Sequence, residues 1–151
     1  MAVLGNTSKA NLKGVHPNLV KVIEEAIKDT PIDFTVTSGV RTLKEQQALY
    51  AQGRTAKGSI VTEKDGVKNK SNHQPKSDGY GHAIDFCPYV NGKLDWNTTK
   101  NFNVIANHIK LTAKRLSVSL RWGADWDNDG VTKSQGDKDE KFVDLPHVEL
   151  K

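Results

Sequence analysis

The sequence predicts an α+β fold in which a small, mostly antiparallel sheet packs with about three helices. Three observations support this prediction. Four short runs, several with alternating or β-branched residues, indicate strands: 34–38, 83–87, 118–122 and the last run, 144–150. Three longer runs with apolar residues at helical spacing indicate helices: 17–28, 43–52 and a run of about 17 residues that ends near 116. The dipeptide Asn91-Gly92 predicts a hairpin turn between adjacent antiparallel strands.

Local signals set the boundaries of the first elements. The helix 17–28 places its apolar residues on one stripe and ends before Pro31. The strand 34–38 is followed by Gly39, and Thr42 with Glu45 then forms a capping box for the next helix. Arg41 therefore lies where a strand passes directly into a helix.

The remaining elements follow a long segment without periodicity. Residues 54–80 are rich in Gly, Ser, Lys and Asn and predict a loop, and loops of this length are usually functional or mobile. The strand 83–87 and the hairpin at Asn91-Gly92 come next. The third helix is expected to be capped at Asn97 or Thr98.

Composition indicates one compact domain that covers residues 1–151 of the 151-residue chain. Cys87, the one cysteine, lies in an apolar run and is expected to be a small buried side chain, so no disulfide framework is predicted. The N-terminus lacks the pattern of a secretory signal, and no apolar run is long enough for a membrane span. We expect no membrane insertion, and we expect a monomer.

The net charge of +4 and the pI near 9.1 favour contact with polyanions such as the acidic polymers of a bacterial envelope. Nucleic acid is a poor candidate, because no aromatic residues interleave the short basic clusters at 64–70 and 110–115.

The strongest functional signal is an ionisable residue inside an apolar strand. Asp85 interrupts the run 83–87, where an unpaired carboxylate would be costly unless a cation or strong donors lie nearby. His73, Asp85 and His147 supply the three protein ligands of a catalytic zinc. Strand alternation places His82 on the opposite face from Asp85, which disfavours His82 as a ligand. His16 and His108 are expected to be ordinary surface or core residues.

Three further residues complete the predicted site. Glu149 shares a strand face with His147 and is predicted to orient it. Asp144 lies three residues before His147 and is predicted to act as the general base. Arg41 is predicted to stabilise an oxyanion or to bind a substrate carboxylate. Taken alone, Asp144 could be an ordinary turn residue and Arg41 a solvated charge at the start of a helix. Their occurrence together with Asp85 favours the catalytic roles.

Several motifs together resemble bacteriophage endolysins of the L-alanyl-D-glutamate peptidase type. These motifs are Ser38 to Thr42, Ser71 to His73, Gly81 to Phe86, Trp122 to Trp126 and Asp144 to Glu149. The resemblance implies the fold shared by hedgehog-like proteins and D-alanyl-D-alanine carboxypeptidases, with zinc on His73, Asp85 and His147. It also implies Asp144 as the base and Arg41 at the oxyanion or substrate.

The implied function is cleavage of the L-alanyl-D-glutamate bond in bacterial peptidoglycan, which lyses the host. The enzyme would stay in the host cytoplasm until holin-mediated release and would work without a separate wall-binding domain. Three alternatives stay open: a D-alanyl-D-alanine carboxypeptidase, a non-catalytic hedgehog-like zinc module and, more remotely, a nucleic-acid binder. The spacing from His73 to Asp85 is longer than in the common motif of the family. Asp78 and His82 therefore stay alternatives to His73 as the third zinc ligand.

A second metal motif lies at 125–130. Asp125, Asp127 and Asp129, followed by Gly130, match the opening of a calcium loop. The twelfth position is Gly136 and offers no closing acid, so a solvated acidic turn is the alternative to a weak calcium site.

Overall fold

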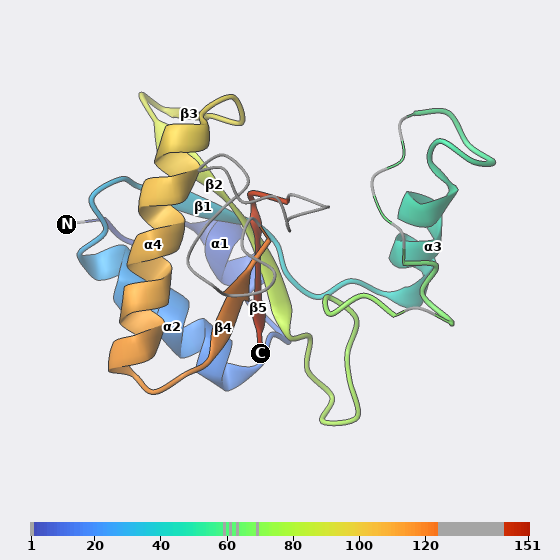
Figure 1. The fold of residues 1–151 in the computed structure, drawn as a ribbon, viewed down its shortest axis with the longest axis horizontal. Coiled ribbons are helices and arrows are strands. Elements are labelled where there is room, and N and C mark those ends of the chain that lie inside the picture. Colours follow the sequence, from blue (N-terminus) through green and yellow to red (C-terminus); the bar gives the residue numbers. More distant parts are fainter. Residues whose placement is uncertain (1, 59, 61, 63, 69, 124–143) are drawn as a thin grey trace, which may run out of the picture.

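The computed structural model describes residues 2–58, 60, 62, 64–68, 70–123 and 144–151. Within these residues the chain forms four helices and five strands (Figure 1). In chain order they are α1 (Asn6–Asn11), α2 (Pro17–Lys28), β1 (Phe34–Ser38), α3 (Leu43–Ala51), β2 (Ala83–Val90), β3 (Lys93–Leu94), α4 (Thr99–Arg115), β4 (Leu120–Trp122) and β5 (His147–Leu150). The predicted α+β class is confirmed.

The strands form one sheet in which every neighbouring pair is antiparallel. Its order is β1-β2-β5-β4, and β3 pairs with the far end of β2. The hairpin at Asn91-Gly92 is confirmed, and positive φ angles of 54° and 77° at these two residues suit a tight turn. The central strand β2 is longer than the predicted run and continues through Pro88, where Tyr89 and Val90 pair with β3.

The hydrophobic core lies between the sheet and the pair α2 and α4, which pack against each other (Figure 1). The predicted stripe of α2 is buried: Leu19, Val22, Ile23, Ala26 and Ile27. The α4 residues Phe102, Ile105 and Ile109 meet it from the other helix. Thr98 caps α4, as one of the two candidate caps predicted, and its hydroxyl accepts from Asn101 N at 3.1 Å.

Cys87 is part of this core, as predicted. It is fully buried, and burial raises the pKa of its thiol to about 11. The group is therefore a neutral thiol near pH 7, and it packs as a small apolar side chain.

The described residues form one helix more than the three expected from apolar periodicity, because α1 has no apolar stripe. Its sequence, NTSKAN, buries only Ser8 and is fixed by polar contacts with β1. Val36 N donates to Ser8 Oγ at 2.9 Å, and Asn11 Nδ2 donates to Val36 O at 2.9 Å. These bonds satisfy the N–H and C=O groups of Val36 on β1, which is an edge strand of the sheet that the described residues form.

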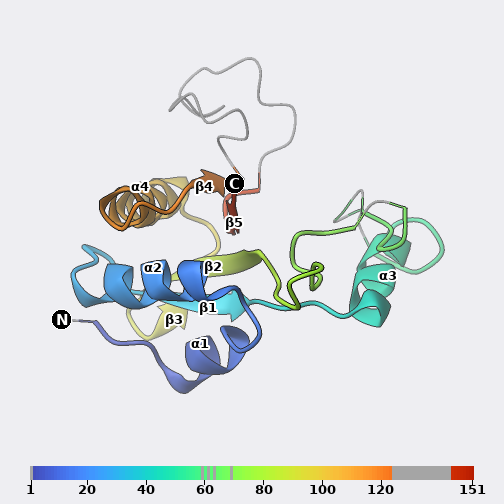
Figure 2. The same ribbon diagram turned by 90° about the horizontal axis from the view of Figure 1, so that it is seen from below.

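The helix α3 and the loop that follows it form a lobe beside the main body (Figures 1 and 2). We call α3 and the described residues between 52 and 70 the α3 lobe. Its helix is capped as predicted, with Thr42 Oγ1 accepting from Glu45 N at 3.1 Å and Glu45 Oε1 accepting from Thr42 N at 3.1 Å. Gln46 is the one buried residue of α3. Among the described residues, no helix is long and apolar enough to cross a membrane.

Candidate metal centre

The register of the sheet brings two predicted ligands together. Asp85 of β2 stands directly opposite His147 of β5. Directly opposed residues project from the same face of an antiparallel pair. The distance from His147 Nδ1 to Asp85 Oδ1 is 3.5 Å. This pairing depends on the strand register and is independent of the long loop.

The loop before β2 delivers the third predicted ligand to the same point. Arg41 N donates to His73 O at 2.8 Å, which fastens the loop to the chain that leaves β1. His73 Nε2 lies 3.4 Å from Asp85 Oδ1, and the side chain of His73 is almost fully buried. His73, Asp85 and His147 thus form a group whose candidate ligand atoms lie within 4.8 Å of one another.

The other ring nitrogens set the direction of each imidazole. His73 Nδ1 lies 2.8 Å from Gly39 O, and a carbonyl accepts only from an N–H. His147 Nε2 lies 2.7 Å from Glu149 Oε1 and is likewise the protonated nitrogen of a neutral ring. Each neutral ring therefore aims its lone pair at Asp85 Oδ1, a buried oxygen with no hydrogen-bond partner among the described residues.

This convergence of three electron pairs fits a metal cation. Ligand atoms about 2.0–2.1 Å from a tetrahedral zinc lie about 3.4 Å from one another. The two nitrogen-to-oxygen distances of 3.4 and 3.5 Å match that spacing. Two histidines and one aspartate match the three protein ligands that a catalytic zinc takes.

In the absence of a metal, the carboxylates of Asp85 and Glu149 favour the protonated form of His147. Burial disfavours the charged form of His147, but the neighbouring carboxylates of Asp85 and Glu149 raise its pKa to about 9. Burial also disfavours the charge on Asp85, yet His147 and His73 hold the pKa of Asp85 well below its usual range. The buried carboxylate of Asp85 is therefore stabilised by a positive charge beside it. A metal ion that binds His147 must first displace the proton of this imidazole.

Glu149 fixes His147 from behind, and its carboxylate is almost fully buried. Arg121, its cross-strand neighbour on β4, donates to Glu149 Oε2 at 2.9 Å, and Asn72 Nδ2 donates to the same oxygen at 2.7 Å. Burial alone would raise the pKa of Glu149, but the hydrogen bonds from His147, Arg121 and Asn72 lower this pKa to about 2. Glu149 therefore joins β4, β5 and the loop before His73 in one charged network.

Asp144 stands at the start of the turn into β5. Asp144 N donates to Gly123 O at 2.8 Å, and Gly123 N donates to His147 O at 2.7 Å. A Cβ on residue 123 would collide with the backbone carbonyl of Asp144, so this close approach requires Gly123. Burial first, and then the charge of Asp85, raise the pKa of Asp144, which makes it a better proton acceptor.

Arg41 lies in the short segment between β1 and α3, and its guanidinium approaches Asp85. Its Nη2 lies 3.8 Å from Asp85 Oδ2, and its Nη1 donates to Gln46 Oε1 at 2.8 Å. Burial lowers the pKa of Arg41, whereas Asp85 and Asp144 oppose that shift. A guanidinium stays charged in proteins, so Arg41 brings a fixed positive charge beside the two carboxylates.

The structure places the two alternative ligands elsewhere. Asp78 and His82 form a separate group with His16 and do not join His73, Asp85 and His147. Strand alternation at His82 explains the separation. The calcium prediction at Asp125, Asp127 and Asp129 lies outside the described residues and stays a prediction.

Sequence reasoning missed three residues that support the centre. Asn72 and Arg121 hold Glu149, and Gln46 holds Arg41. The position of Asn72 directly before His73 could have indicated its role from the sequence. The other two contacts depend on strand register and on the folding of the α3 lobe, for which the sequence carries no local pattern.

Two histidines and a carboxylate lie close enough to hold one metal ion, with a second carboxylate and a guanidinium beside them, and this combination of groups suits the class of metallopeptidases. The family model of phage L-alanyl-D-glutamate peptidases matches residues 1–151. The chain belongs to this family, so the family predicted from the sequence motifs is confirmed.

Curated relatives agree with this membership. The L-alanyl-D-glutamate peptidase of Escherichia phage T5 is 36% identical over 126 residues, which is 83% of this chain and 82% of the relative. The peptidoglycan L-alanyl-D-glutamate endopeptidase CwlK of Bacillus subtilis (strain 168) is 32% identical over 143 residues, 90% of this chain and 73% of the relative.

Solved structures share the fold at lower identity. The Serratia marcescens L-Ala D-Glu endopeptidase ChiX superposes with a TM-score of 0.64 at 22% identity and covers 97% of this chain and 87% of its own. The vancomycin resistance D,D-dipeptidase VanXYg, solved with a D-Ala-D-Ala phosphinate analogue, gives a TM-score of 0.54 at 17% identity. That match covers 90% of this chain and 50% of VanXYg. The predicted hedgehog and D,D-peptidase type of fold is confirmed.

Proposed function

We propose that this protein is a zinc endopeptidase that cleaves the L-alanyl-D-glutamate bond of bacterial peptidoglycan, with His73, Asp85 and His147 as the zinc ligands. One observation carries the metal assignment. The second ring nitrogen of each imidazole faces the buried Asp85 Oδ1, at 3.4 Å from His73 and 3.5 Å from His147, and this oxygen has no hydrogen-bond donor among the described residues. Family membership and the two curated relatives support the choice of bond.

Zinc held by these ligands would lower the pKa of a coordinated water to about 7 and polarise the scissile carbonyl. The protein residues supply the remaining steps. Asp144, with its raised pKa, accepts the proton of the attacking water and then donates it to the leaving amine. Arg41 presents its guanidinium to the oxyanion or to a substrate carboxylate, with Gln46 holding it in place.

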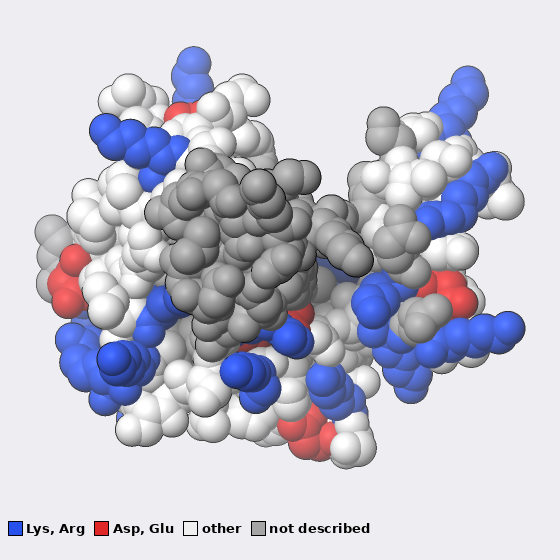
Figure 3. Space-filling model, in the orientation of Figure 1, with Lys and Arg blue, Asp and Glu red and all other residues white. Residues whose placement is uncertain are grey.

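The charge of the molecule suits an acidic polymer. In Figure 3, Lys and Arg side chains gather on the α3 lobe and along the lower edge of the main body. The D-glutamate residue and other acidic groups of the wall carry negative charge, so this basic surface favours association with the substrate. Delivery to the wall through holin-made holes, from synthesis in the host cytoplasm, belongs to the same proposal.

The mass of the products tests the choice of bond. Purified peptidoglycan incubated with the zinc-loaded protein is expected to release stem peptides that begin at D-glutamate, as measured by mass spectrometry. Loss of a single terminal alanine instead would identify a D,D-carboxypeptidase. Unchanged muropeptides with zinc still bound would favour a non-catalytic zinc module.

A pair of variants tests the separate roles of ligand and base. His147→Ala is expected to lose both stoichiometric zinc at this centre and activity, because it removes a ligand nitrogen. Asp144→Asn is expected to keep the zinc and to lose about 10²- to 10⁴-fold in kcat, the usual contribution of a general base. Full metal and full activity in His147→Ala would refute the ligand set, and a fully active Asp144→Asn would refute the base.

A further inference from the structure

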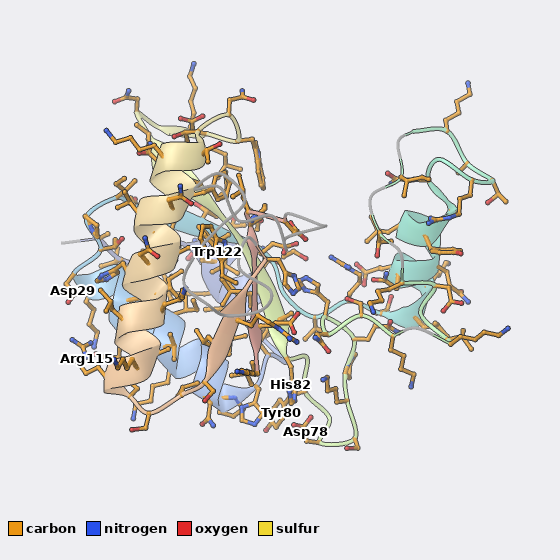
Figure 4. All side chains as sticks on the ribbon, viewed as in Figure 1. Asp29, Asp78, Tyr80, His82, Arg115 and Trp122 are labelled. Atoms are coloured by element: carbon orange, nitrogen blue, oxygen red, sulfur yellow. The ribbon has the colours of Figure 1, made fainter. Side chains whose placement is uncertain are left out.

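We propose that His16, Asp78 and His82 form a second site for a divalent transition-metal ion, separate from the catalytic centre. Their candidate ligand atoms all lie within 4.8 Å of one another. Figure 4 shows Asp78, Tyr80 and His82 together at the end of the loop that leads into β2. His16 reaches this point from the start of α2.

The three side chains meet around one carboxylate oxygen. His82 Nε2 lies 2.7 Å from Asp78 Oδ2, and His16 Nε2 lies 3.9 Å from the same oxygen. The two imidazole rings stand edge to face, with centroids 5.1 Å apart. The side chains are 20–38% exposed, so an ion can reach them and water can complete its coordination.

Hydrogen bonds with backbone groups hold the three residues in place independently of any metal, and His82 N donates to Asn72 O at 2.7 Å. His16 N donates to Gly81 O at 2.9 Å, and Gly81 N donates to Gly14 O at 3.0 Å. Asp78 Oδ1 accepts from Tyr80 N at 2.9 Å, which leaves Oδ2 turned toward the two histidines. A site whose ligands are already positioned loses little conformational entropy when an ion binds.

Each imidazole can present a nitrogen lone pair to an ion. His82 Nε2 hydrogen-bonds Asp78 Oδ2 at 2.7 Å, and no described residue hydrogen-bonds its Nδ1. The proton can therefore sit on Nδ1 while Nε2 binds the metal in place of that hydrogen bond. His16 Nδ1 accepts from Asn18 N at 3.1 Å and thereby caps α2. Binding through His16 Nε2 moves the proton to Nδ1, so the metal bond replaces this cap.

The donor set determines the class of ion. Two imidazoles and one carboxylate suit Zn²⁺, Ni²⁺ or Cu²⁺, whereas Ca²⁺ and Mg²⁺ prefer oxygen ligands. An ion here would tie the loop carrying Asp78 and His82 to the first turn of α2. That loop begins at His73, so the second site braces the segment between two ligands of the catalytic centre.

Three variants remove metal ligands while they keep the local structural roles. His16→Asn retains a side-chain oxygen that caps α2. Asp78→Asn retains the oxygen that accepts from Tyr80 N and removes the charge. His82→Gln removes the imidazole at a partly exposed position. His108→Gln, on α4, is the control for loss of a histidine outside both groups.

The test is a titration of metal-free protein with Zn²⁺, followed by calorimetry and by thermal unfolding. Wild type and His108→Gln are expected to bind two equivalents, and the second raises Tm. Each of the three site variants is expected to bind one equivalent, to lose the second rise in Tm and to keep peptidase activity at one equivalent of zinc. His147→Ala is expected to keep the second binding event.

The readouts separate this proposal from the proposed function. One equivalent in wild type, or two equivalents in all three site variants, would overturn the second site. A second equivalent that disappears only in the site variants supports it, whichever peptide bond the enzyme cleaves.

Discussion

The two sides of the catalytic centre are built by different means. Asp85 and His147 lie on adjacent strands whose other face packs on the core formed with α2 and α4. Arg41 leads into the α3 lobe, whose one buried helical residue is the polar Gln46. One side is supported by apolar packing and the other by hydrogen bonds. We therefore expect the sheet side to govern stability and metal binding, and the lobe side to govern catalysis.

The polar interior of the lobe centres on Gln46. Its Nε2 donates to Lys64 O at 2.7 Å, and its Oε1 accepts from Arg41 Nη1. A second glutamine, Gln74, donates to Gly66 O at 3.1 Å and accepts from Ser71 N at 2.9 Å. These bonds connect α3, the loop and the segment around His73, and no residue described in the α3 lobe belongs to the hydrophobic core.

Removal of core volume is expected to have the largest effect. Phe102 is buried on α4, with its ring 5.4 Å from that of Phe86. Phe102→Ala should lower the free energy of unfolding by about 3–5 kcal/mol, as measured by urea denaturation. Leu111→Ala, at an exposed position of the same helix, should change it by less than about 0.5 kcal/mol. Equal urea midpoints for the two variants would contradict a core-supported sheet side.

An intermediate effect is expected for Glu149, whose carboxylate contacts the proposed zinc ligand His147. Glu149→Gln removes the charge that orients His147 and pairs with Arg121. Zinc affinity at the catalytic centre should fall about 10- to 100-fold, as measured by competition with a chelator. Glu24→Gln on the exposed face of α2 is the control and should leave affinity unchanged. Wild-type affinity in Glu149→Gln would mean that the strand alone positions His147.

The smallest effect is expected in the lobe and should be confined to catalysis. Gln46→Leu removes the acceptor for Arg41 and the donor to Lys64 O. The value of kcat/KM should fall about tenfold, in line with one hydrogen bond to a charged group, while zinc affinity stays the same. The exposed neighbour Gln47→Leu is the matched control. A loss of zinc in Gln46→Leu would show that the lobe also supports the metal ligands.

The same contrast explains which features were predictable from sequence. The stripe of α2, the capping box of α3 and the Asn91-Gly92 hairpin are local patterns, and all three are present. Helix α1 escaped prediction because its contacts with Val36 are made by polar side chains from distant sequence. A position on a strand constrains Asp85 and His147, whereas His73 approaches through a loop whose path the sequence does not define.

The contact between Gly123 and Asp144 has a consequence for how this enzyme can vary. Two backbone hydrogen bonds join Gly123 to Asp144 and His147, so the end of β4 is tied directly to the start of β5. A side chain at residue 123 would collide with the backbone carbonyl of Asp144. Any residue other than glycine there would therefore displace Asp144 and the turn into His147 together, although residue 123 itself carries no ionisable group.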